Sequence, residues 1–135
     1  MFGMLLVSHG DIGVEMLRAL NHIVGPQDQA AAISIAPEDD MDSCRNMILA
    51  RIKEVNTGDG VVLLTDMFGG TPSNLAISVM PKTDAVVLAG VNLPVLVKLA
   101  SLRQTNPLHD AVKEAADSGR KYIQLVTENL AVPTT

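Results

Sequence analysis

One histidine lies where open parallel-sheet proteins commonly place reactive side chains, at the end of a predicted strand. His9 follows the short apolar run Phe2–Ser8, which is typical of a buried strand. An imidazole uses one ring nitrogen to attack or accept, and the other must then keep its proton. A carboxylate that accepts this N–H fixes the tautomer and stabilises the cation that forms. Asp66, directly after the predicted strand Val61–Thr65, is the best-placed candidate for this partner.

The sequence DMFGGTP at residues 66–72 supplies the second half of a candidate site. Two glycines, Gly69 and Gly70, precede a predicted helix that Thr71 caps, with a proline in its first turn. Such glycines let backbone N–H groups turn toward an anion, and the helix dipole favours negative charge there. We therefore predict that Gly69, Gly70 and the Thr71 hydroxyl cradle a phosphoryl group carried by His9.

Four more residues at strand ends are candidates for contact with a partner protein. Gly10 leaves room beside the histidine, Met67 and Phe68 lie in the glycine-rich turn, and Asn92 follows a later predicted strand. Taken singly, a histidine after a strand and a Gly-Gly-Thr-Pro turn both have ordinary structural explanations. Their joint placement at strand ends favours a functional interpretation.

Other chemistry is not indicated. His22 and His109 are interpreted as surface or packing residues, and the three histidines have no spacing suited to a shared metal. The aspartates within residues 39–42 lack the glycine-centred pattern of a calcium loop, and the seven methionines are typical of core filler. No P-loop glycine–lysine motif is present. We expect neither a metal nor a cofactor.

Apolar runs of strand length alternate with stretches of helical periodicity. The predicted strands cover residues 2–8, 31–36, 61–65, 85–89 and 122–126. The first predicted helix, capped by Asp11, has the apolar stripe Ile12, Met16, Leu20 and Ile23, and the second has Met41, Cys44, Ile48, Ile52 and Val55. This alternation predicts an α/β fold, with a mostly parallel sheet covered by helices on both faces. We expect residues 1–130 to form one domain and residues 131–135 a disordered tail.

Composition narrows the function classes. The chain has 135 residues, which suits one domain, and a net charge of −5 without a basic stripe. It has only three aromatic residues, so a nucleic-acid partner is not expected. Cys44 is the only cysteine, and no signal peptide or run of the roughly 20 apolar residues that a membrane helix needs is present. We expect a cytoplasmic protein.

Three segments together resemble a known family. MLLVSHGD at residues 4–11, LLTDMFGGTP at 63–72 and GVNLPVL at 90–96 are similar to the mannose-type EIIA domains of the bacterial phosphoenolpyruvate:sugar phosphotransferase system, and the similarity extends over essentially the whole chain. The resemblance implies a phosphotransferase with a phosphohistidine intermediate. His9 matches the acceptor, modified on Nε2, Asp66 matches the orienting aspartate, and Thr71 matches a hydroxyl residue that is serine in many members.

The resemblance also implies partners. Members accept phosphate from phospho-HPr and pass it to an EIIB protein, which here would be a separate chain, so the membrane permease is reached only indirectly. They form homodimers in which the last strand, here Tyr122–Val126, joins the partner's sheet antiparallel to the other strands. The fold implied is therefore a three-layer α/β domain with an exchanged last strand.

Alternatives remain open at this point. The same His9 switch would serve a regulatory module that docks to a partner protein, or a phosphoryl donor to a dihydroxyacetone kinase. An aspartyl-phosphate receiver built on Asp66 would need an acidic pair after the first strand and a lysine ending the last, whereas Lys121 precedes the last predicted strand. A serine hydrolase built on Ser8 lacks the nucleophile elbow.

Overall fold

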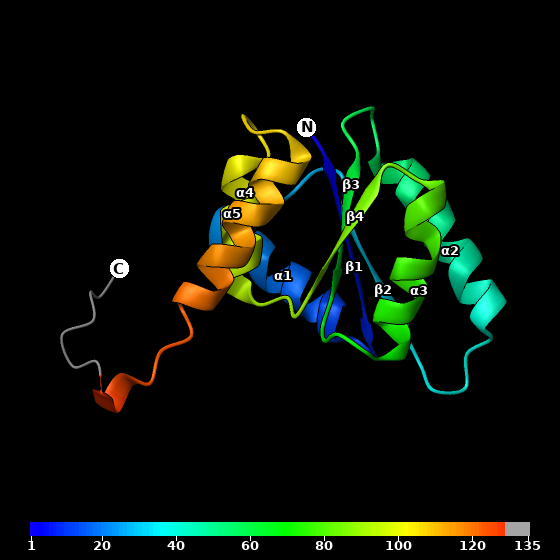
Figure 1. The fold of residues 1–135 in the computed structure, drawn as a ribbon, viewed down its shortest axis with the longest axis horizontal. Coiled ribbons are helices and arrows are strands. Elements are labelled where there is room, and N and C mark those ends of the chain that lie inside the picture. Colours follow the sequence, from blue (N-terminus) through cyan, green and yellow to red (C-terminus); the bar gives the residue numbers. More distant parts are fainter. Residues whose placement is uncertain (129–135) are drawn as a thin grey trace.

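The computed structural model describes residues 1–128, so the predicted tail at 131–135 lies outside the described residues. The elements follow one another as β1 (Gly3–His9), α1 (Ile12–Val24), β2 (Ala30–Ile35), α2 (Met41–Val55), β3 (Val61–Thr65), α3 (Thr71–Val79), η1 (Met80–Lys82), β4 (Ala85–Ala89), α4 (Leu93–Leu102), α5 (Leu108–Lys121) and η2 (Val126–Glu128). Four of them form a parallel sheet in the order β2-β1-β3-β4 (Figure 1). This confirms the α/β fold and the parallel sheet.

The sheet is the middle of three layers. Helices α1, α4 and α5 cover one face, and α2 and α3 cover the other (Figure 1). Side chains alternate along each strand, so Leu5 and Leu63 point into the core under α2 and α3, whereas Met4 and Leu64 point into the core under α1, α4 and α5. Burial on both faces explains why the strands are continuous apolar runs. Within the described residues, no helix is long and apolar enough to span a bilayer.

The apolar stripe predicted for α1 is partly wrong. Leu20 is fully buried, but Ile12 and Ile23 are 46% and 54% exposed. The helix approaches the sheet closely at Gly13, where an added Cβ would lie 3.0 Å from the Cβ of Leu6. The buried face therefore follows Gly13 and Leu20, and the two isoleucines fall to its sides. In α2 the predicted stripe is confirmed except at Met41, which is 37% exposed.

The last predicted strand, Tyr122–Val126, is wrong for the single chain. Tyr122 directly follows α5, and the segment then leaves the body of the domain before the short 3₁₀ turn η2 (Figure 1). A strand needs a neighbour for its backbone N–H and C=O groups, and no described strand of this chain pairs with the segment. Its apolar side chains are exposed, with Ile123 at 75% and Leu125 at 60%.

A buried arginine fastens the end of the sheet opposite to His9. Arg103 is 1% exposed, and its Nη2 donates to the carbonyl oxygens of Phe2 at 2.8 Å and Gln29 at 3.1 Å. These carbonyls immediately precede β1 and β2. The guanidinium therefore supplies the buried carbonyl of Phe2 with its donors and adds a second donor to the carbonyl of Gln29, which also accepts the N–H of Met4 at 2.9 Å.

We predict that Arg103→Met lowers the free energy of unfolding by about 2–4 kcal/mol, because the buried carbonyl of Phe2 loses its donors. Urea unfolding measures the loss. The matched control is Arg18→Met, because Arg18 is an exposed arginine that pairs with Glu15 on α1. This substitution should lower the free energy of unfolding by less than about 0.5 kcal/mol. Equal losses in the two variants would contradict a structural role for the buried guanidinium.

Candidate functional site

His9 and Asp66 meet at the point where the strand order of the sheet reverses. The chain runs from β1 to β2 on one side and then returns to place β3 on the other side of β1. His9 is the last residue of β1, and Asp66 directly follows β3. Their side chains are joined by a hydrogen bond of 2.7 Å between Nδ1 and Oδ2, and the backbone N–H of His9 donates to the same oxygen at 3.2 Å. Sites of open α/β sheets form at this kind of position.

The protonation pattern of the pair follows from its surroundings. Burial disfavours the charged carboxylate of Asp66, but hydrogen bonds from the His9 side chain and backbone outweigh burial, so its pKa lies below the ordinary value of 3.8. An ionised carboxylate can only accept, so in the neutral imidazole Nδ1 carries the proton and Nε2 has the lone pair. The His9 side chain is 46% exposed, against 12% for Asp66. The histidine can therefore be approached while its partner is sheltered.

Gly70 lies against the other nitrogen of the ring. A Cβ at this position would be 2.7 Å from Cε1 and 3.0 Å from Nε2 of His9. The backbone of Gly70 is extended, with φ −96° and ψ 175°, a conformation that other residues adopt without strain. Glycine is needed here for space rather than for conformation. Any larger residue would displace the ring or cover Nε2.

The turn before α3 differs in detail from the predicted cradle. Gly70 is the N-cap and Thr71 the first helical residue, because the extended backbone of Gly70 precedes the helix. The N–H of Gly69 donates to the Ser73 hydroxyl at 2.9 Å and is therefore already used. The helix has no side-chain cap, so the N–H of Thr71 stays available beside an exposed side chain.

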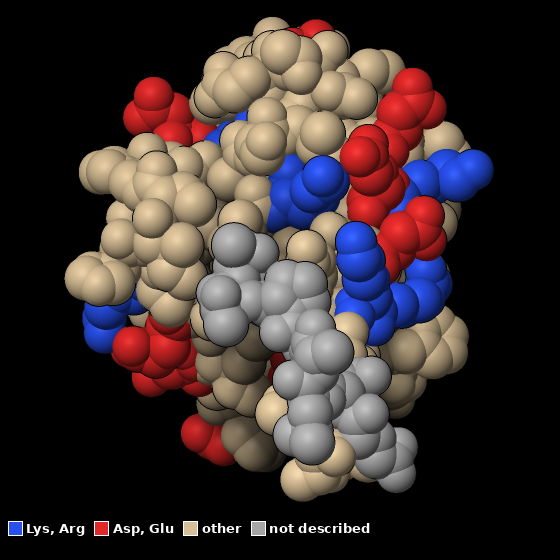
Figure 2. All heavy atoms as spheres, turned by 90° about the vertical axis from the view of Figure 1, so that its left-hand side faces the viewer, with Lys and Arg blue, Asp and Glu red and all other residues tan. Residues whose placement is uncertain are grey.

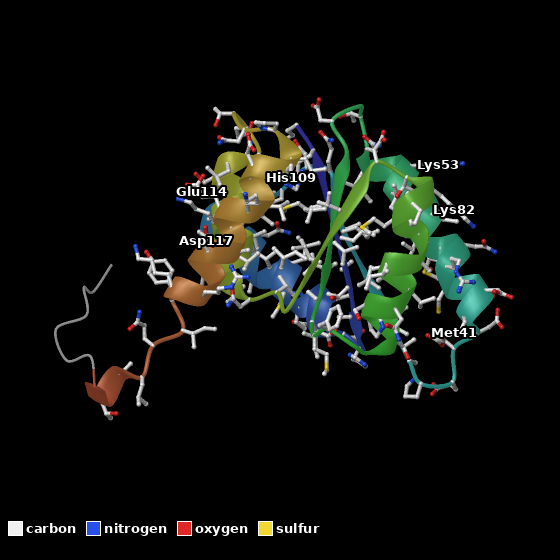
Figure 3. The ribbon with its side chains drawn as sticks, in the orientation of Figure 1. Met41, Lys53, Lys82, His109, Glu114 and Asp117 are labelled. Atoms are coloured by element: carbon white, nitrogen blue, oxygen red, sulfur yellow. The ribbon has the colours of Figure 1, made fainter. Side chains whose placement is uncertain are left out.

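A shallow hollow of about 320 Å³ opens beside the histidine. It is bounded by His9, Gly10 and Thr71, and its other wall is apolar and consists of Ile35, Ala36, Pro37 and Met41. Figure 3 shows Met41 at the start of α2, near the same end of the sheet. Within residues 1–128, no lysine or arginine lines the hollow.

The four candidates for partner contact lie in different environments. Phe68 is 76% and Met67 55% exposed, which is unusual for large apolar side chains. Gly10 has φ +51° with open space around it. The amide of Asn92 works inside the fold, because its oxygen accepts from the N–H of Val95 and its nitrogen donates to the carbonyl of Gly119.

Sequence reasoning missed several side chains that hold the site. Asp11, predicted to cap α1, instead accepts from the Ser34 hydroxyl at 2.6 Å. The N–H of Gly13 donates to the Ser8 hydroxyl, and the Ser73 hydroxyl accepts a hydrogen bond from the turn before α3. A serine three residues after an N-cap glycine was the available signal for Ser73.

His22 and His109 are exposed, and His109 lies near the start of α5, away from Met41 (Figure 3). The described residues contain no group of three or more potential metal ligands.

Comparison with known proteins gives a consistent result. A family model named EIIA-man and described as "PTS system fructose IIA component" matches residues 3–116. The fructose-specific EIIA component of Bacillus subtilis (strain 168) is 26% identical over 131 residues, covering 96% of this chain and 90% of that protein. The mannose-specific EIIAB component of Escherichia coli (strain K12) is 29% identical over 119 residues, which are 87% of this chain and 37% of that longer protein. The crystal structure of EIIA from Streptococcus agalactiae has a similar fold, with a TM-score of 0.87, 23% identity and coverage of 95% of this chain and 99% of that chain.

The Asp66 carboxylate predicts a pH dependence of stability. Its pKa is lower in the folded state than its ordinary value of 3.8, so its stabilising effect is fully present above pH 3.8 and is lost as the pH falls through the folded-state pKa. Asp66→Asn keeps an acceptor oxygen for His9 but cannot ionise. We predict that the wild type exceeds this variant in free energy of unfolding most at pH 7, and that the difference shrinks below pH 3.8. Urea unfolding from pH 7 to pH 3 measures it, and a constant difference would contradict the prediction.

Proposed function

Since this chain belongs to the EIIA-man family of sugar phosphotransferase components, we propose that it carries the phosphoryl group on Nε2 of His9. One observation supports this assignment above the others: the 2.7 Å hydrogen bond to Asp66 occupies Nδ1, so Nε2 is the nucleophile. The remaining parts of the reaction follow from the groups around the ring.

The transfer step is a substitution at phosphorus. The Nε2 lone pair of His9 forms the new N–P bond while the N–P bond of the donor phosphohistidine breaks and its imidazole takes back the electron pair. Asp66 keeps the Nδ1 proton in place and stabilises the positive charge that develops on the ring. Phosphoryl transfer asks little covalent chemistry of a protein beyond such positioning and charge stabilisation.

The phosphoryl oxygens are proposed to lie at the start of α3. The helix lacks a side-chain cap, and its uncapped N–H groups and positive dipole end favour an anion. Thr71 adds a hydroxyl beside His9, because both residues border the same hollow. Of the predicted cradle we retain Gly70 and Thr71 as donors, while Gly69 acts through the shape of the turn.

The donor and acceptor are proposed to be phospho-HPr and an EIIB protein, and the place of action the cytoplasm. The name of one relative, an EIIAB component, joins EIIA with EIIB. The exposed side chains of Met67 and Phe68 next to Asp66 offer an apolar contact for either partner. The membrane permease would be served only through the acceptor.

The function is tested by labelling with phosphoenolpyruvate, EI and HPr. We predict that His9→Ala abolishes labelling, because no other nitrogen replaces Nε2. Gly70→Ala should keep the fold and the histidine but reduce labelling by at least about tenfold, because its methyl group displaces the ring. The wild-type label should be lost in acid and kept in base. Full labelling of His9→Ala, or a base-labile label, would overturn the assignment.

A homodimer is also proposed, supported by an unpaired sheet edge. β4 pairs only with β3 among the described strands. A groove of about 410 Å³ lies between residues 86–89 of β4 and α5 and includes Ile123 among its walls. Figure 2 shows the α4–α5 side, where charged side chains of both signs gather along one part and most of the remaining visible surface is uncharged. We propose that residues 122–126 of a second copy add to this edge as an antiparallel strand.

If residues 122–126 join the partner's sheet, a charged side chain in this segment should weaken the dimer. Ile123→Lys should weaken the dimer by at least about tenfold, since a lysine would be buried in the groove beside Lys113 and Arg120. The matched control is Ile23→Lys, because Ile23 is an exposed isoleucine at the end of α1. Sedimentation equilibrium gives both dissociation constants. A monomeric wild type, or equal effects of the two variants, would contradict the proposal.

A further inference from the structure

We propose that Ser73 is a positioning residue for phosphoryl transfer, which fastens the glycine turn that holds Gly70 against His9. This inference rests on the proposed function and concerns a side chain that neither the sequence motif nor the family resemblance assigns. Ser73 lies on the first turn of α3, two residues after Thr71.

The burial of Ser73 needs an explanation. Among the described residues only four polar or charged side chains are buried, and Ser73 is 0% exposed. A buried hydroxyl is unfavourable unless hydrogen bonds replace its contacts with water. At a solvent-facing helix start a serine would be unremarkable, but this one is enclosed. Its partners therefore indicate its role.

Both hydrogen bonds of the hydroxyl go to the turn. Oγ accepts from the N–H of Gly69 at 2.9 Å and donates to the carbonyl oxygen of Gly70 at 3.2 Å. The one proton of the hydroxyl is thereby used, and the peptide units on both sides of the Gly69–Gly70 pair are tied to the helix. The carbonyl of Gly70 also accepts the N–H of Asn74 at 3.0 Å, so the same oxygen joins the turn to α3.

The turn needs such a tie because of its composition. Two adjacent glycines have more backbone freedom than any other pair, and Gly69 adopts φ +93°. The atoms of Gly70 must nevertheless stay so close to the ring that a methyl group would lie 2.7 Å from Cε1. Without the Ser73 hydroxyl, the turn gains alternative conformations in which Gly70 and Thr71 no longer face Nε2.

The expected kinetic signature follows from complete burial. Ser73 cannot touch a docking partner, so its loss should leave the KM for phospho-HPr within about twofold. The maximal transfer rate should fall by about tenfold, because small displacements of positioning groups have effects of this size or larger. A residue that only stabilised the fold would change neither value once the protein is folded.

Another serine on the same helix provides a matched control. The hydroxyl of Ser78 donates to the carbonyl of Leu75 at 2.7 Å and accepts from Nε of Arg45 at 3.2 Å. It makes the same number of hydrogen bonds as Ser73, but none of them reaches the glycine turn. Ser78 is exposed, unlike Ser73, so Ser78→Ala removes a hydroxyl with the same number of hydrogen bonds from the surface of α3 without releasing Gly69 or Gly70.

The experiment compares Ser73→Ala, Ser73→Cys and Ser78→Ala with the wild type in two measurements. Amide hydrogen exchange reports the turn directly: the Gly69 amide should exchange at least about tenfold faster in Ser73→Ala and be unchanged in Ser78→Ala. Stopped-flow transfer from phospho-HPr gives KM and the maximal rate. Ser73→Cys, which nearly keeps the volume but bonds weakly, should behave like Ser73→Ala and replaces it if the alanine variant does not fold.

The outcomes separate this inference from the proposed function. Unchanged Gly69 exchange, an unchanged maximal rate, or a rise in KM alone would each overturn the role of Ser73. A wild type that accepts no phosphoryl group would overturn the proposed function, whatever the exchange data show. Faster exchange together with a slower maximal rate, absent in Ser78→Ala, is the result that the proposal requires.

Discussion

The hydrogen bond between Nδ1 of His9 and Oδ2 of Asp66 joins residues that are 57 positions apart in the chain. It forms only if β1 and β3 are neighbours in a fixed register, with Val7 opposite Thr65. A slip of one residue would turn every side chain of a strand to the other face of the sheet. Both faces are buried under helices, so after such a slip the side chains of the strand would fit neither of the two cores. The packing of the two cores thus determines the geometry of the site.

The connection between β3 and α3 contacts both ring nitrogens of His9. The β3–α3 segment places Asp66 at Nδ1, and four residues later it places Gly70 at Nε2. The ring is therefore oriented on one side by a carboxylate and bordered on the other by backbone, while it stays 46% exposed. Any motion of this segment changes the surroundings of both nitrogens together. A rigid connection is accordingly more important here than a rigid histidine, which explains why its glycines are tied to a buried side chain.

Much of the fold could be predicted from the sequence, because local signals and tertiary structure agree. β3 and β4 have the predicted bounds, since each is an apolar run that ends beside a glycine or an aspartate. The pairing of His9 with Asp66 followed from the rule that parallel strands end at one edge. The burial of α1 did not follow, because Ile12 and Ile23 fit the helical period as well as Leu20 does. The close approach at Gly13 decides between them, and such an approach is a property of two elements rather than of one.

The segment after α5 fails as a prediction for a related reason. Residues 122–126 have the apolar and β-branched composition of a strand, but a strand also requires an edge with which to pair. Within the described chain the edge of β4 stays unpaired, so the composition of the segment and the free edge are complementary. Local propensity describes the composition of the segment but could not show whether a neighbouring strand is available to pair with it.

Among the described residues, no cationic side chain lines the hollow beside His9, so the proposed binding of the phosphoryl group relies on dipoles. Hydrogen bonds to a charged guanidinium or ammonium group are about twice as strong as those between neutral groups. The proposed donors to the phosphoryl group are instead backbone N–H groups and one threonine hydroxyl at an uncapped helix start. Such dipoles orient the three oxygens and reduce their mutual repulsion without binding them as tightly as a cation would. In the proposed reaction, Asp66 pairs with the positive charge that the ring carries once the N–P bond has formed and Nδ1 is still protonated. In this proposal the phosphoryl oxygens are held by dipoles, which bind an anion less tightly than a cation would, and this favours transfer of the group to the acceptor.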